Sequence, residues 1–350
     1  ALYSGGAPAS LAENDIIYVD ADAPGPTHDG STWDFAYTTL QPALADAEAE
    51  DQIWVAAGTY TPTVEYGGSG DRYRSFQMAN GVAIYGGFDP LVGHDEWEER
   101  DWVLHETILS GDLNGDDGAD FENNGENSYH VFNHWDGDPD LDNTAVLDGF
   151  TITGGNAVGE YPRDRGGGML NNGSSPTLAN CAFHGNSAGS GGGLLNNDFS
   201  SPVLTNVSFT DNVANWSHGG GLLNAYNSAP TLTGCTFKGN HTDQFGGGMS
   251  NYESSHPVLI NCIFSGNSAT ADGGGLINSM DSAAELINCT FSGNSAQRGG
   301  AMANYYSSPT LTNCILWGDS QPEVYNANAS STPAFTYSDI QGGCDAAPYS

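Results

Sequence analysis

The chain has 350 residues, of which 48 are glycine and 38% are hydrophobic. This apolar content is too high for a disordered chain, and the glycines lack the three-residue period of collagen. Seven Lys and Arg residues against 43 Asp and Glu residues give a formal charge of −36, which argues against a nucleic-acid partner or an anionic membrane surface. No run of 18 apolar residues occurs, so we predict no membrane span and expect cations as counter-ligands.

The charge is concentrated in the first half of the chain. Residues 1–165 contain 32 of the 43 carboxylates, whereas residues 166–350 contain 11. We therefore divide the chain into an N-terminal arm (1–15), capped N-terminal coils with acidic loop insertions (16–165), six repeats (166–320) and the end of a solenoid (321–350). The first residue is Ala1 rather than Met, which is typical of a protein that has lost a secretion signal. We expect a secreted or cell-surface location.

The N-terminal part combines one helical segment with short strands. Residues 39–50 have helical composition, with Leu40, Ala43, Leu44 and Ala47 along one face. An open end of a stacked sheet exposes unpaired backbone, so we expect this helix to cap it. Apolar, partly β-branched segments predict strands at 53–57, 82–85, 107–110, 129–133 and 145–153.

An acidic loop follows the strand at 107–110. It reads GDLNGDDGADFENNGEN, and alternating carboxylate and amide oxygens with glycines suit a hard cation. We predict a Ca²⁺ site whose ligands are Asp112, Asn114, Asp116, Asp117, Asp120 and Glu122. The spacing departs from an EF-hand loop, and the alternative interpretation is a solvated acidic loop without a metal.

From Gly166 the same phrase of 25 to 28 residues restarts six times, at Gly166, Gly191, Gly219, Gly246, Gly273 and Gly299. Each copy carries apolar residues at fixed positions, separated by Gly, Asn and Ser-Pro turn signals. A unit this short cannot bury its apolar face alone and must stack on its neighbours. The pattern predicts an all-β, single-stranded, right-handed parallel β-helix, a solenoid with a short N-terminal capping helix.

Three columns of asparagine also recur. We interpret them chiefly as turn-stabilising ladders, because an Asn amide can bond to its own copy one turn along. The other interpretation is an ordered polar binding surface. The columns are Asn171, Asn196, Asn224, Asn251, Asn278 and Asn304; Asn180, Asn206, Gly234, Asn261, Asn288 and Asn313; and Asn186, Asn212, Asn240, Asn267, Asn294 and Asp319.

Five cysteines occupy one further column, and in the second copy of the repeat Val207 stands at the position of the cysteine. A position that accepts Val is a small core position, and stacked neighbours suit a disulfide poorly. We therefore expect buried free thiols at Cys181, Cys235, Cys262, Cys289 and Cys314. Cys344 lies outside the column, and its redox state is left open.

Aromatic residues follow the Asn171-type column in a variable segment. Stacked at the spacing of the turns, they would form a platform for sugar rings or a partner protein, although they would also serve to cover the coil. These candidate binding residues are Phe199, Tyr226, Tyr252, Tyr305 and Tyr306. The arginine pairs at 72 and 74 and at 163 and 165 are interpreted as charge partners for the acidic loops.

The segments IIYVDADAPG, GVAIYGGF and AVLDGFTITGGNA, followed by GGGM/L..SPTLTNCTFSGNSA units, resemble secreted right-handed β-helix proteins of the pectate-lyase-like superfamily. The likeness includes surface-anchored bacterial members, and the repeats are similar to those of chlamydial polymorphic outer-membrane proteins. It extends from about residue 16 to 343. The resemblance implies the fold and an extracellular role that is structural or adhesive, with a homo-oligomer, a filament, a glycan or a cell-surface molecule as partner.

The sequence argues weakly against catalysis. It lacks a Gly-x-Ser-x-Gly elbow, a His-Glu-x-x-His motif and a phosphate loop, and the repeats hold only Lys238 and Arg298 as bases. An acidic chain also repels acidic polymers. A glycosidase needs only two carboxylates, however, so a polysaccharide-active enzyme, whether a lyase or a glycoside hydrolase, or a carbohydrate-binding module is the alternative function.

Overall fold

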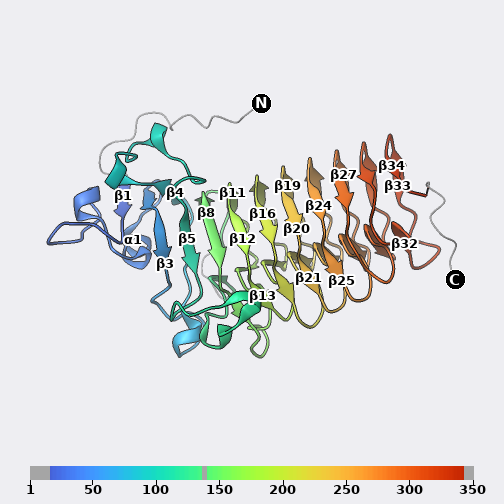
Figure 1. The fold of residues 1–350 in the computed structure, drawn as a ribbon, viewed down its shortest axis with the longest axis horizontal. Coiled ribbons are helices and arrows are strands. Elements are labelled where there is room, and N and C mark those ends of the chain that lie inside the picture. Colours follow the sequence, from blue (N-terminus) through green and yellow to red (C-terminus); the bar gives the residue numbers. More distant parts are fainter. Residues whose placement is uncertain (1–15, 136–139, 343–350) are drawn as a thin grey trace.

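The chain winds into a parallel β-helix, as the computed structural model shows for residues 16–135 and 140–342 (Figure 1). Every pairing between its named strands is parallel, and each turn of the coil adds one strand to two or more of four long sheets. The expected all-β, right-handed solenoid is therefore confirmed. Among the described residues, no helix has both the length and the apolar character needed to cross a membrane.

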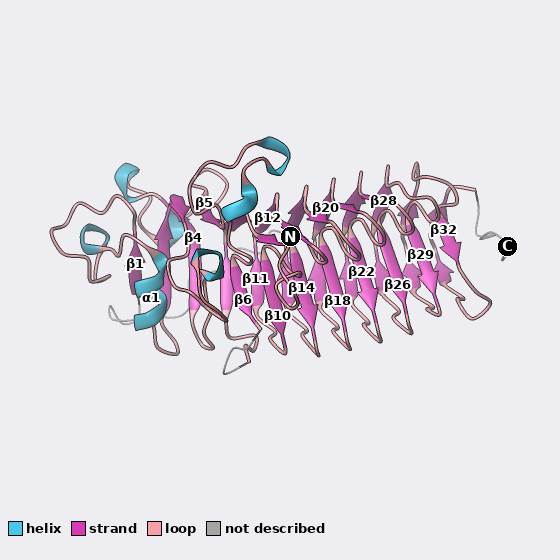
Figure 2. Ribbon diagram, turned by 90° about the horizontal axis from the view of Figure 1, so that it is seen from below, coloured by secondary structure: helices cyan, strands magenta, loops and turns pink. Residues whose placement is uncertain are grey.

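The four sheets run along the coil and share its turns (Figure 2). The 11-stranded sheet contains β1 (Ile16–Val19), β2 (Gln52–Ala56), β4 (Ala83–Phe88), β7 (Val146–Asp148), β11 (Thr177–Ala179), β15 (Val203–Thr205), β19 (Thr231–Thr233), β23 (Val258–Ile260), β27 (Glu285–Ile287), β30 (Thr310–Thr312) and β33 (Ala334–Thr336). The eight-stranded sheet contains β6 (Phe132–His134), β10 (Met169–Asn172), β14 (Leu194–Asn197), β18 (Leu222–Ala225), β22 (Met249–Tyr252), β26 (Leu276–Ser279), β29 (Met302–Tyr305) and β32 (Val324–Asn326).

The two remaining sheets complete each turn. The ten-stranded sheet contains β3 (Gly58–Tyr60), β5 (Thr107–Ser110), β8 (Phe150–Thr153), β12 (Ala182–His184), β16 (Ser208–Thr210), β20 (Thr236–Lys238), β24 (Ile263–Ser265), β28 (Thr290–Ser292), β31 (Ile315–Leu316) and β34 (Asp339–Ile340). The five-stranded sheet contains β9 (Asn156–Ala157), β13 (Ser187–Ala188), β17 (Val213–Ala214), β21 (His241–Thr242) and β25 (Ser268–Ala269).

The apolar columns of the repeat form the interior. Phe183, Phe209, Phe237, Phe264 and Phe291 are fully buried and stack face to face, with ring centroids 4.6–5.1 Å apart. This spacing matches the separation of neighbouring strands, so identical side chains on successive turns meet directly. The repeat pattern thus produces one continuous core along the axis.

Two of the three asparagine columns lie inside the coil. The Asn171 and Asn186 columns are almost completely buried, and each amide bonds to the same residue on the next turn, as in the 2.9 Å bond from Asn196 Nδ2 to Asn224 Oδ1. The third column is partly exposed and takes the left-handed conformation, with φ of 50° at Asn180 and 66° at Gly234. The buried columns therefore stabilise turns, and they offer no surface to a ligand.

The cysteine column is buried with its thiols free, as expected. The thiols contact backbone carbonyl oxygens, for example that of Cys181 with Leu147 O at 3.5 Å. Burial raises the pKa of Cys181 to about 12. These thiols are therefore neutral core groups, which makes them poor nucleophiles and poor metal ligands. Cys344 lies outside the described residues.

The capping helix is shorter than predicted. α1 spans Leu40–Asp46 instead of residues 39–50, and its Leu40 and Ala43 are buried against β1 and β2 at the N-terminal end of the coil. The predicted continuation carries two further carboxylates, and negative charge at a helix C-terminus opposes the helix dipole. Among the described residues, the other helical segments are single 3₁₀ turns: η1 (Trp33–Phe35), η2 (Asp71–Tyr73), η3 (Pro90–Val92), η4 (Trp97–Glu99), η5 (Ala119–Phe121) and η6 (Asn124–Glu126).

Candidate functional site

The acidic loop after β5 brings three carboxylates together. Oxygen atoms of Asp112, Asp117 and Glu126 all lie within 4.8 Å of one another. The Asp112 carboxylate also accepts backbone N–H bonds from Gly115 at 2.7 Å and from Asp117 at 3.1 Å, so the loop folds around it. Oε1 of Glu126 is buried without a hydrogen-bond partner among the described residues. Burial, together with the neighbouring carboxylates, raises the pKa of both Asp117 and Glu126.

This cluster overlaps only in part with the six ligands predicted from sequence. Asp112 and Asp117 belong to it, whereas Asn114, Asp116 and Glu122 are exposed and lie outside the cluster of three. The side chain of Asp120 lies outside the described residues. Glu126 was missed because it comes four residues after the predicted set, at the end of the 3₁₀ turn η6. Its signal in the sequence was the second glutamate of the same run, in GEN.

The five aromatic residues proposed as a platform do not fall into one column. Tyr252 and Tyr305 share a position but are separated by the turn that carries Ser279. Tyr226 and Tyr306 lie one residue further along, and Phe199 one further still. Phe199 and Tyr306 are about two-thirds exposed. No two neighbouring turns place members of this set at the same position, but the rings of Tyr226 and Tyr252 on neighbouring turns still pack edge to face with centroids 6.0 Å apart. The five therefore include a contacting pair without sharing one column.

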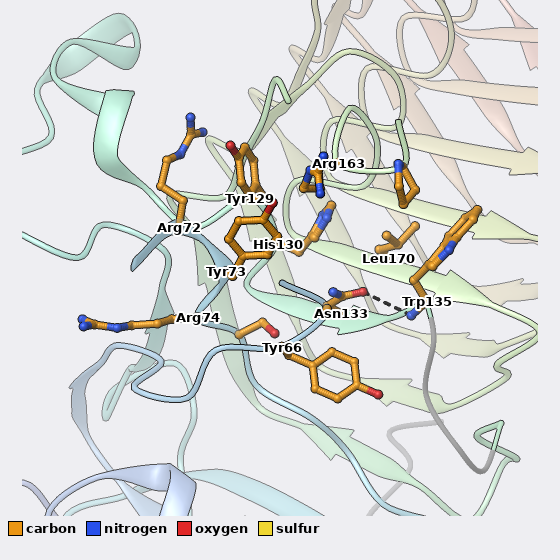
Figure 3. Close-up of a pocket in the computed structure, with 13 residues that line it drawn as sticks. Tyr66, Arg72, Tyr73, Arg74, Tyr129, His130, Asn133, Trp135, Arg163 and Leu170 are labelled. Carbon is orange, nitrogen blue, oxygen red and sulfur yellow. Dashed lines mark hydrogen bonds between the residues drawn. The ribbon is translucent and has the colours of Figure 1, made fainter. Parts of the chain in front are cut away.

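A different set of aromatic side chains lines a pocket at the N-terminal end of the eight-stranded sheet (Figure 3). Tyr66 and Tyr73 come from the insertion between β3 and β4, Tyr129 and Trp135 flank β6, and Leu170 of β10 is fully buried beneath Trp135. Tyr73 and Tyr129 pack edge to face with centroids 5.4 Å apart. The pocket has a volume of about 100 Å³, which is enough for several water molecules or for a substituent of a sugar ring.

Three arginines line the same pocket, and each is held differently. Arg72 lies over the ring of Tyr129 at 4.2 Å and donates to the backbone oxygens of Asn127 at 2.8 Å and Asn156 at 2.7 Å. Arg74 pairs with the exposed Asp71 at 2.6 Å and extends away from the aromatic side chains in Figure 3. Arg163 lies over the ring of Tyr73 at 5.3 Å. Within the described residues, no carboxylate pairs with Arg72 or Arg163, so only Arg74 of the three fits the predicted role of charge partner.

The polar groups of the pocket are otherwise neutral. His130 is buried, and its Nδ1 lies 3.0 Å from the carbonyl oxygen of Gly166. Burial lowers the pKa of His130 to about 4, so the ring is uncharged at neutral pH. Asn133 accepts the backbone N–H of Trp135 at 3.1 Å. None of the 13 lining residues carries a carboxylate, in a chain that contains 43.

Comparisons with known proteins assign no residue roles. No family model and no curated protein sequence matches the chain. Among solved structures, it is similar to the pectate lyase Pel9A, with 12% identity over 95% of this chain and 78% of that chain and a TM-score of 0.44. It is also similar to a rhamnogalacturonan lyase, with 10% identity over 95% of this chain and 89% of that chain and a TM-score of 0.34. At these identities no catalytic residue is transferred from either enzyme.

Proposed function

We propose that this chain is an extracellular adhesive β-helix protein that binds a glycan at the pocket of Tyr73, Trp135 and Arg163 and leaves the glycan intact. The observation that carries the proposal is the composition of the pocket, in which aromatic, arginine and asparagine side chains surround a cavity, with no carboxylate among the described lining residues. Aromatic rings provide flat apolar contact area for a sugar face, and their polar edges tolerate water.

The same composition argues against hydrolysis at this pocket. A glycosidase needs two carboxyl groups about 5–10 Å apart on either side of the bond that breaks. The described lining residues supply none, and His130, the imidazole among them, is buried with its Nδ1 3.0 Å from a backbone carbonyl oxygen. The rest of the coil supports a structural role, because the repeated side chains are used in stacking and produce a continuous rod.

The three-carboxylate cluster supports a second part of the proposal, a bound cation. Asp112, Asp117 and Glu126 supply oxygen atoms close enough to share one ion, and Ca²⁺ accepts further oxygens from backbone and water. Asn127 connects the cluster to the pocket. Its side-chain amide donates a hydrogen bond to the Asp117 carboxylate at 2.7 Å, and its backbone carbonyl oxygen accepts a hydrogen bond from the Arg72 guanidinium. Ca²⁺ here would hold the loop that positions one wall of the pocket.

A glycan-binding screen tests the proposal. The wild-type chain should bind at least one class of oligosaccharide, and Trp135→Ala should lose most of this binding. Tyr306→Ala is the matched control, because Tyr306 is an exposed aromatic far along the coil and belongs to the platform predicted from sequence. Products should show no new reducing or unsaturated ends. Cleavage of the bound glycan, or loss of binding in Tyr306→Ala alone, would contradict the proposal.

A further inference from the structure

The pocket contains a positive charge that has no anionic partner among the described residues. Arg163 is half-buried, and in the described part of the chain its guanidinium has an aromatic neighbour, Tyr73, but forms neither an ion pair nor a side-chain hydrogen bond. The arginine at 165, two residues along, lies 3.6 Å from Asp164. In a chain with six times as many acids as bases, a cation without a carboxylate partner at the wall of a cavity is an exception.

The pocket that Arg163 lines also contains an amide hydrogen-bond donor. The side-chain oxygen of Asn133 accepts a hydrogen bond from the backbone N–H of Trp135, and the Asn133 Nδ2 has no acceptor among the described residues. Figure 3 shows Arg163 beside His130, between Tyr73 on one side and Leu170 with Trp135 on the other. A cation together with an amide donor requires a ligand that brings negatively charged oxygen atoms.

The net charge of the chain does not prevent such a ligand from binding. At physiological ionic strength the screening length is about 8 Å, so carboxylates further away repel an anion only weakly. A contact between the guanidinium and an anion at hydrogen-bond distance is screened much less, because part of the contact excludes water. The local absence of carboxylates therefore matters more than the total of −36.

We infer that the pocket binds a sugar that carries an anionic substituent, a carboxylate or a sulfate, with the substituent against Arg163 and the sugar ring across Tyr73 and Trp135. The inference rests on the proposed glycan binding and names the ligand class for that site. The volume of about 100 Å³ fits this arrangement, since it accommodates the substituent while the ring lies at the mouth of the pocket.

Calorimetry with matched probes tests the inference. The carboxylate probe is a hyaluronan hexasaccharide, and its control is the same hexasaccharide with each carboxyl reduced to an alcohol. The sulfate probe is a chondroitin sulfate hexasaccharide whose carboxyl groups have been reduced to alcohols, and its control is the same carboxyl-reduced hexasaccharide without sulfate. The wild-type chain should bind at least one charged probe ten-fold more tightly than that probe's control. The pair that shows this difference identifies the anion as carboxylate or sulfate.

Two variants locate the effect. Arg163→Gln should weaken binding of the preferred charged probe by about ten-fold and leave the neutral control within two-fold. Arg74→Gln removes the same charge from a neighbouring lining residue that already has Asp71 as its partner, so its effect should be under about two-fold. An unchanged melting temperature of Arg163→Gln shows that the variant is folded.

The outcomes separate this inference from the proposed function. If neutral and charged probes bind equally, or if Arg163→Gln and Arg74→Gln act alike, the anionic ligand class is wrong while glycan binding stands. If no oligosaccharide of a broad screen binds the wild-type chain, both the inference and the proposed function are wrong.

Discussion

At the scale of single residues, the buried amides carry an unusual share of the structure. Asn240 is fully buried, and its Oδ1 accepts from both Asn212 N and Asn212 Nδ2 at 3.0 Å, while its Nδ2 donates to Phe209 O at 2.9 Å. Asn240→Ala removes these three buried hydrogen bonds, and of the two Asn212 donors only Nδ2 keeps another acceptor among the described residues, the carbonyl oxygen of Phe183 at 2.8 Å. We predict a loss of about 3 kcal/mol of unfolding free energy, measured by chemical denaturation.

Asn206→Gly is the matched control for this prediction. Asn206 belongs to the partly exposed column, has φ of 54°, and is replaced by Gly in the next repeat at Gly234. Glycine adopts this conformation freely, so the change should cost less than about 1 kcal/mol. Equal losses in the two variants would show that the buried ladder adds nothing beyond its turn geometry.

A second residue-scale prediction concerns the last turns of the coil. Asp319 is the last residue of the buried Asn186 column, and its carboxylate accepts the backbone N–H of Asn294 at 2.6 Å. Asp319 and Glu323 are both buried. Each has one carboxyl oxygen without a hydrogen-bond partner among the described residues. Burial and the neighbouring Asp319 carboxyl raise the pKa of Glu323 to about 7. A single proton between the two carboxyl groups would satisfy both oxygens.

The consequence is a fall in stability with rising pH. Because the folded pKa of Glu323 lies above its unfolded value, the protonated pair stabilises the fold at low pH, and this stability is lost as pH rises from about 4.5 through 7. Glu323→Gln should keep a hydrogen-bond donor, flatten this part of the pH profile and stabilise the chain at pH 8 by about 2 kcal/mol. Thermal melts from pH 5 to 8 measure both effects. A variant that melts with the wild-type pH profile would refute the shared proton.

At the scale of elements, the acidic loop between β5 and β6 is the part that a cation should stabilise. If Ca²⁺ binds Asp112, Asp117 and Glu126, an excess of about 100-fold over the dissociation constant adds about 2.7 kcal/mol to the free energy of unfolding. The melting temperature should therefore rise when Ca²⁺ is added and fall back to its metal-free value after chelation. Asp117→Asn should abolish this response.

Asp116→Asn tests whether the response belongs to the cluster or to charge alone. Asp116 is exposed, adjacent in sequence and outside the cluster, so its variant should respond to Ca²⁺ like the wild-type chain. If both variants lose the response to the same extent, the effect is general screening of an acidic loop. If neither the wild-type chain nor a variant responds, the cluster does not bind Ca²⁺.

At the scale of the whole molecule, the sequence predicts the regular part of the coil and only fragments of the site. Residues such as Phe237 and Asn240 recur at a fixed interval, and stacking converts that interval directly into contact. The pocket has no period. Tyr73, Trp135 and Arg163 come from three insertions of different length, and only the path of the N-terminal turns brings them together.

The aromatic residues proposed as a platform do not share one column, for a related reason. In the variable segment after the Asn171 column, the chain turns through pairs of left-handed residues such as Asp198 with Phe199 and Tyr226 with Asn227. A shift of one residue at such a turn changes the direction in which a side chain points. Composition shows that aromatics are present there, but only the backbone register decides which of them meet.

As a whole, the molecule is proposed to hold an intact glycan in its aromatic pocket. A crystal structure of the chain with a bound oligosaccharide checks this. We expect a sugar ring against Tyr73 and Trp135, an anionic substituent at Arg163, and unbroken glycosidic bonds. A sugar bound instead along Phe199 and Tyr306, or a cleaved product at any carboxylate pair, would contradict it.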